Sequence, residues 1–139
     1  MKQTLLYEKY PLFVLELGRD ETELDSVDAI CDYFRERIEA HRCGRFIAVF
    51  DHYGHTCTLP EGQVSKDIRA AKNVIFCFGI ALPNAHVLAV RPRSIGVAET
   101  TRGFVISFME APMPIANAAM EDLAEGLRKP ATEPLAPSP

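Results

Sequence analysis

The chain has 139 residues, of which 47% are hydrophobic and 24% charged, and its formal net charge at pH 7 is −4. A chain of this length and composition can bury its own core, so extensive disorder is excluded and a single domain is expected over residues 1–129. No stretch concentrates Lys and Arg as the neutralisation of several phosphates requires, so a nucleic acid is not expected as a partner.

The first 17 residues do not have the pattern of a targeting segment. Glu8, Lys9 and Pro11 interrupt the apolar residues, and no apolar run is long enough to span a bilayer. We therefore expect a cytoplasmic protein with no membrane partner. In a reducing compartment its four cysteines should be thiols or metal ligands and not disulfides.

A strand and a helix are predicted first along the chain. Residues 11–17 are short, aromatic and β-branched and end at Gly18, which predicts a largely buried strand. A helix then begins at Asp25, which can cap free N–H groups, and ends at Gly44 in the left-handed conformation. The apolar residues that recur at helical spacing on its buried face are Val27, Ile30, Cys31, Phe34 and Ile38.

The middle of the chain predicts mainly strands. Residues 73–81 are apolar on both faces, which is typical of a central strand, and a short helical segment is predicted from Ser65. Residues 100–103 contain a Gly and suit a hairpin turn. The remaining predicted strands cover residues 45–50, 86–90, 94–99 and 103–109.

A second helix is predicted after Pro112-Met113-Pro114, because proline suits the first helical turn. Its small residues Ala116 and Ala119 allow close approach either to the sheet, as ordinary core packing, or to a ligand held between helix and sheet. Residues 130–139 contain four prolines and are predicted to be a flexible tail. Turns join most of the strands, so we expect an α+β fold: a mainly antiparallel sheet with both helices on one face.

The polar segment Asp51–Cys57 gathers more groups able to bind a metal or move a proton than any other part of the chain. His52, His55 and Cys57 would provide three zinc ligands if Gly54 turned the chain back, and Cys77 could complete the set. If the strand continues instead, alternation places the two histidines on opposite faces. Hydrogen bonding at a strand end would also account for the polar residues at the start of this segment.

Other candidate groups are weaker. Cys57 lies beside a histidine and is the most plausible nucleophile among the cysteines. The loop Gly79–His86 follows the most apolar strand and can contribute to a pocket, although turn chemistry alone explains its Pro83-Asn84. Arg91 and Arg93 can bind an anion or form an exposed basic turn.

The sequences Phe50-Asp51-His52, Ile75-Phe76-Cys77-Phe78-Gly79 and the final strand that ends at Pro112 resemble the domain-of-unknown-function 302 family. The similarity covers residues 11–128. The chain departs from that family where Ile80-Ala81-Leu82 separates Phe78-Gly79 from Pro83-Asn84. The resemblance implies a β-α-β4-α fold of the TATA-binding-protein-like type, often dimeric, with no established activity.

Our leading hypothesis is a small binding or accessory protein, dimeric and without catalysis, that binds a small molecule or partner. Its pocket would lie between the sheet and the last helix, with Asp51, His52 and His55 as ligand-binding residues at the rim. The alternative is a metal- or thiol-dependent enzyme, with zinc or another transition metal, that uses these residues together with Cys57. A third class is an interaction module recruited through the tail, residues 130–139.

Overall fold

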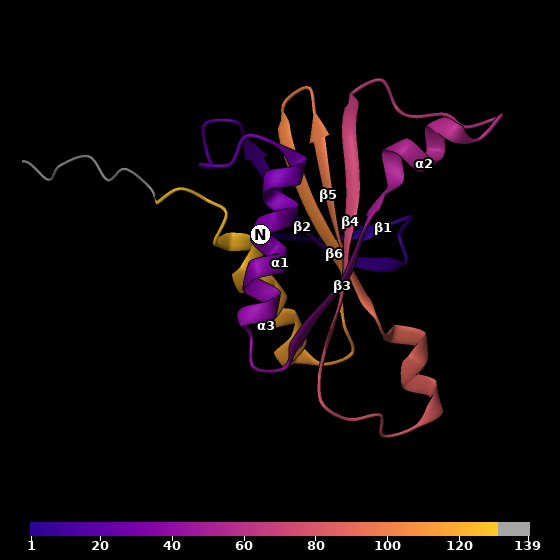
Figure 1. The fold of residues 1–139 in the computed structure, drawn as a ribbon, viewed down its shortest axis with the longest axis vertical. Coiled ribbons are helices and arrows are strands. Elements are labelled where there is room, and N and C mark those ends of the chain that lie inside the picture. Colours follow the sequence, from indigo (N-terminus) through magenta and orange to yellow (C-terminus); the bar gives the residue numbers. More distant parts are fainter. Residues whose placement is uncertain (131–139) are drawn as a thin grey trace, which may run out of the picture.

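A computed structural model of the protein describes residues 1–130, so the tail predicted over residues 130–139 lies, except for its first residue, outside the described part. A six-stranded antiparallel sheet forms the centre of the fold, in the spatial order β1-β2-β6-β5-β4-β3 (Figure 1). The α+β class and the antiparallel sheet are therefore confirmed. The strands are β1 (Lys2–Leu6), β2 (Tyr10–Gly18), β3 (Gly44–Asp51), β4 (Ile68–Phe78), β5 (Arg93–Thr100) and β6 (Gly103–Met109).

Two helices, α1 (Val27–Ala40) and α3 (Pro114–Glu125), cover one face of this sheet, as expected (Figure 1). Two shorter helices, α2 (His52–Thr58) and the 3-10 helix η1 (Ala85–Val90), lie near opposite ends of the sheet. None of the helices in the described part is long and apolar enough to cross a membrane. The largest fully buried core side chains lie between the sheet and α1 or α3 and include Leu15, Ile30, Phe34, Phe76, Ile95, Phe104, Ile106 and Met120.

The ends of α1 differ in detail from the prediction. Ser26, and not Asp25, is the N-cap, and its hydroxyl accepts a hydrogen bond of 3.0 Å from the Ala29 N–H. Gly44 is not a left-handed stop but the first residue of β3. A Cβ on Gly44 would lie 2.3 Å from the Ile38 carbonyl oxygen, so glycine is needed there for close packing of the helix end on the sheet.

Several element predictions are wrong. β1 was not predicted, and it adds an edge strand to the order that the family resemblance implies. The segment predicted as a helix from Ser65 instead leads into β4, which begins at Ile68 and ends at Phe78. Residues 86–90 form part of η1 and not a strand; the Asn84 side chain caps this helix by accepting a 2.9 Å hydrogen bond from the His86 N–H.

The sheet face opposite α1 and α3, which we call the open face, carries small and apolar side chains and few charges. Along each strand, half-exposed residues alternate with buried ones. The pairing register aligns the half-exposed residues of neighbouring strands on the open face. The small and apolar residues of the open face are Leu12, Val14, Ala48, Ala71, Ile75, Gly96, Ala98, Val105 and Met109.

Candidate functional site

The polar segment that follows β3 forms the short helix α2, capped by Asp51. The Asp51 Oδ1 atom accepts a hydrogen bond of 2.9 Å from the Gly54 N–H. A Cβ on Gly54 would lie 2.6 Å from the Asp51 Oδ2 atom, so a larger residue there would require the carboxylate to shift. Asp51 therefore has a structural role as the helix cap.

The helix brings His52 and His55 to the same side, because residues three apart on a helix are neighbours. Their ring centroids lie 6.4 Å apart, and each ring packs against Phe50, at 5.2 Å for His52 and 5.3 Å for His55. The strand does not continue through this segment, so the alternative in which alternation separates the histidines does not occur.

The His52 ring is fixed by a chain of hydrogen bonds across the open face. Its Nδ1 atom lies 3.0 Å from the Asn73 Oδ1 atom on β4, and the Asn73 Nδ2 atom donates to the Ser94 Oγ atom of β5 at 3.0 Å. With the Asn73 amide in this orientation, Nδ1 of His52 carries the proton. The neutral ring then has an unshared electron pair on Nε2, as a general base requires.

The zinc set suggested by the sequence is not assembled. Within residues 1–130, no three or more His, Cys, Asp or Glu side chains are grouped so that they could hold a metal ion. Cys57 is exposed on α2, and Cys77 is half-buried near the other end of β3 and β4, where it pairs with Arg45. His52 and His55 therefore form an aromatic cluster with Phe50 rather than a metal centre with the cysteines.

The remaining cysteines differ in their surroundings. Cys31 is buried in the core below α1, and this burial raises the pKa of its thiol to about 11, so it is protonated at neutral pH. Its predicted place on the buried face of the first helix is confirmed. Cys43 is half-buried at the start of β3.

An apolar cavity of about 360 Å³, which we call the α3 pocket, lies where α3 begins against the sheet. The α3 side of this pocket consists of Met113, Ile115, Ala116 and Ala119. The segment from the end of β4 to β5 contributes Phe78, Gly79, Pro83, Val87, Val90, Arg91 and Arg93. Its lining thus joins the small residues of α3 to the Gly79–His86 loop, both of which the sequence indicated separately.

The α3 pocket and the histidine cluster lie at opposite ends of β3. His41, Cys43 and Phe78, which line the pocket, are adjacent to the Gly44 end of β3, whereas α2 begins after Asp51. Seven residue steps along a strand span about 23 Å. Asp51, His52 and His55 are not among the residues that line the pocket, in contrast to their expected position at its rim.

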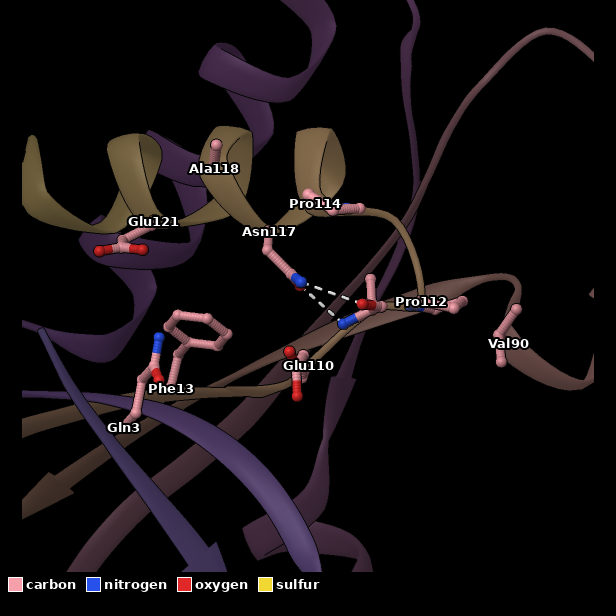
Figure 2. Close-up of a pocket in the computed structure, with 10 residues that line it drawn as sticks. Gln3, Phe13, Val90, Glu110, Pro112, Pro114, Asn117, Ala118 and Glu121 are labelled. Atoms are coloured by element: carbon pink, nitrogen blue, oxygen red, sulfur yellow. Dashed lines mark hydrogen bonds between the residues drawn. The ribbon is translucent and has the colours of Figure 1, made fainter.

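A second concavity of about 640 Å³ lies on the other side of α3, between that helix, β1 and β2 (Figure 2). Its lining includes the polar or charged residues Gln3, Glu110 and Glu121 around Phe13. Figure 2 shows that the Asn117 side chain points to the backbone just before α3. Its amide accepts from the Ala111 N–H at 2.6 Å and donates to the Ala111 carbonyl at 2.9 Å, which ties α3 to the end of β6.

The chain matches the model of a family of unknown function, DUF6858, over residues 1–129. The chain belongs to this family. The similarity to the domain-of-unknown-function 302 family is not confirmed, although both families are without an assigned function. No curated protein and no solved structure matches the chain. Membership of DUF6858 therefore adds no catalytic or ligand-binding residue, and the site has to be inferred from its geometry.

In this DUF6858 member, sequence reasoning missed Asn73 and Ser94 as partners of His52. Asn73 is a polar residue next to an apolar run of β4. A polar residue in this position indicates a hydrogen-bond partner on the sheet, which here is His52. Asn117 was also missed, because an Asn inside a helix is compatible with simple exposure to solvent. The two arginines of the α3 pocket were identified as possible anion-binding residues, but their place in its lining was not predicted.

Proposed function

We propose that this DUF6858 protein binds a small apolar molecule in the α3 pocket and has no catalytic activity of its own. Ligand pockets in proteins commonly have volumes of roughly 300–1,000 Å³ and mainly apolar walls with a few polar groups. The α3 pocket has about 360 Å³ and is lined mostly by apolar side chains, with Arg91, Arg93 and His41 as its charged or polar groups. This agreement in size and lining is the observation that carries the proposal.

The surface around the α3 pocket also supports binding. Ile115, which lines the pocket, is 81% exposed, and Ile80 and Leu82 on the adjoining loop are 90% and 70% exposed. Large apolar side chains gathered at one place on a surface are typical of a binding site. A bound apolar ligand would cover part of this surface and make its burial favourable.

Octan-1-ol is a suitable neutral probe of the α3 pocket. We expect it to shift the backbone amide NMR signals of Gly79, Ala116 and Ala119, because these residues line the cavity. Replacing Ala119 with Phe should abolish these shifts, since the larger ring fills the cavity. Ala118 lies on α3 toward the second concavity, so Ala118→Phe is the matched control and should leave binding unchanged. Absence of shifts in the unmodified protein, with this probe and with charged probes of the same chain, would contradict the proposal.

The competing proposal is an enzyme that uses His52 as a general base. It is favoured by the hydrogen bond between His52 and Asn73, which fixes the ring and makes Nε2 the nitrogen with the lone pair in the neutral tautomer. Steady turnover of a small substrate that is lost in His52→Ala, with the fold intact by circular dichroism, would replace the binding proposal with this one.

We also propose that the protein is a cytoplasmic homodimer formed through its open face. The four cysteines are free thiols, as a reducing compartment favours. No helix within residues 1–130 covers the middle of the open face, and its small residues, including Gly96 and Ala98, would let the sheet of a second copy approach closely.

Light scattering should therefore give twice the mass of the 15.5 kDa chain at micromolar concentration. Ala98→Arg should give a monomer, because it places a charge in the middle of the interface. Glu121→Arg, on α3 and beside the second concavity, is the control and should stay dimeric. A monomeric mass for the unmodified protein over a wide concentration range would exclude this assembly.

A further inference from the structure

We propose that the ligand of the α3 pocket is a free anion with an apolar body, and that Arg93 and Arg91 bind its anionic group. This inference rests on the proposed function, because it concerns the same cavity. It adds the chemical class of the ligand and the residues that would distinguish it from a neutral or cationic molecule of the same size.

The charges around the α3 pocket are all of one sign. Its lining includes Arg91, Arg93 and His41 and contains no Asp or Glu. Among residues 1–130, neither arginine has a carboxylate oxygen within the 4.0 Å of an ion pair, whereas Arg19 and Arg128 do. The protein thus directs two uncompensated guanidinium groups to an otherwise apolar cavity.

Arg93 has a donor that the protein does not use. Its Nη2 atom donates to the Met109 carbonyl and its Nη1 atom to the Val90 carbonyl at 3.4 Å, but its Nε atom is buried and has no hydrogen-bond partner. Burial lowers the pKa of this guanidinium, since the charged group has lost water without gaining an opposite charge. Buried polar groups without partners are uncommon in proteins. Because Arg93 lines the α3 pocket, an anion bound there would supply the opposite charge that its guanidinium lacks.

Arg91 is held across the same pocket by contacts with uncharged groups. Its Nη1 atom donates to the Ala81 carbonyl at 2.5 Å, and its Nη2 atom lies 3.9 Å from the Met113 sulfur, a poor acceptor. The side chain therefore connects the loop after β4 to the start of α3. The carbonyl and the thioether leave its positive charge uncompensated.

The chemistry of guanidinium groups defines the ligand. An arginine presents its N–H groups in a planar fork that suits the two oxygens of a carboxylate. The apolar part of the ligand would contact Phe78, Val87 and Ala116 on the pocket walls. A neutral ligand would fill the cavity but leave both charges uncompensated, and a cation would add repulsion.

Three probes with the same chain but different charge test this inference in the unmodified protein: octanoate, octan-1-ol and octylammonium. We expect octanoate to bind about 10- to 100-fold more tightly than octan-1-ol, as is typical of hydrogen bonds to a charged group, and octylammonium to bind most weakly. Amide NMR titration gives each dissociation constant. Equal affinities for octanoate and octan-1-ol would overturn the anion inference alone, whereas no pocket shifts with any probe would overturn the proposed function itself.

Variants then assign the charge preference to the arginines. Arg91→Gln should reduce the preference for octanoate over octan-1-ol at least several-fold. Arg93→Lys keeps the charge but loses the planar fork, so it should also reduce the preference. Arg102→Gln, on the exposed β5–β6 turn, is the control and should leave the ratio unchanged. An unchanged ratio in both Arg91→Gln and Arg93→Lys would show that the arginines do not bind the anion.

Discussion

Replacing Gly103 with alanine is expected to lower the free energy of unfolding by about 2–6 kcal/mol. Gly103 begins β6 with a positive φ of 143°, a conformation that side-chain-bearing residues rarely adopt. A Cβ at this position would also lie 2.1 Å from the Leu17 carbonyl oxygen, so β2 and β6 would have to separate where Gly18 pairs with Gly103. Urea unfolding followed by circular dichroism measures the loss.

The matched control is Gly96→Ala on the neighbouring strand β5. A Cβ on Gly96 would lie 3.3 Å from the Ser107 Oγ atom, and the backbone there is not in the positive-φ region. The serine hydroxyl is at the end of a short side chain and can move by a few tenths of an ångström. We therefore expect the free energy of unfolding to fall by at most about 1 kcal/mol, because the better strand propensity of alanine offsets part of the loss. Similar losses at the two positions would contradict the strain argument.

Elements with strong local signals were predictable from the sequence. The apolar face of α1 recurs at helical spacing, and all five residues assigned to that face are buried. The hairpin of β5 and β6 was recognisable because two short β-branched runs flank a turn with Gly103. These signals depend only on residues that are close in sequence, so no tertiary information was needed.

The elements that were missed lack such signals or depend on distant contacts. The β1–β2 hairpin turns at Tyr7 and Glu8, both with positive φ, although neither is the Gly or Asn that usually marks such a turn. The apolar run of η1 has no periodicity that separates a strand from a helical turn. α2 begins where the Asp51 carboxylate accepts from the Gly54 N–H and lies close to the position that a Cβ of residue 54 would occupy, a relation that is visible only in three dimensions.

The same distinction applies to the candidate site. Ala116, Ala119, Arg91 and Arg93 were each noticed in the sequence, but every one of them had a simpler explanation in isolation. These residues come together because the segment between β4 and β5 folds toward the start of α3. The sequence of this segment has no regular pattern that would predict its path. The histidine cluster shows the opposite case: a conspicuous composition whose geometry does not assemble the zinc set.

Asn117 is expected to determine both the stability of the fold and the shape of the α3 pocket. Its side-chain amide satisfies the N–H and the carbonyl of Ala111, a buried residue that lines the pocket. Asn117→Ala leaves both backbone groups without this partner and should cost about 2–5 kcal/mol in the free energy of unfolding. Chemical denaturation measures this cost. Asn84→Ala, which removes an exposed cap of η1, is the control and should cost about 1 kcal/mol or less.

The Asn117→Asp variant separates the two hydrogen bonds of this tether. An ionised carboxylate can still accept from the Ala111 N–H, but it cannot donate to the Ala111 carbonyl and is repelled by it. We expect the stability of this variant to lie between that of the unmodified protein and that of Asn117→Ala. Octan-1-ol affinity should fall in the same order, because a looser start of α3 moves Met113 and Ala116 relative to the loop that forms the opposite wall. Loss of stability with unchanged octan-1-ol affinity would show instead that the pocket does not depend on this tether.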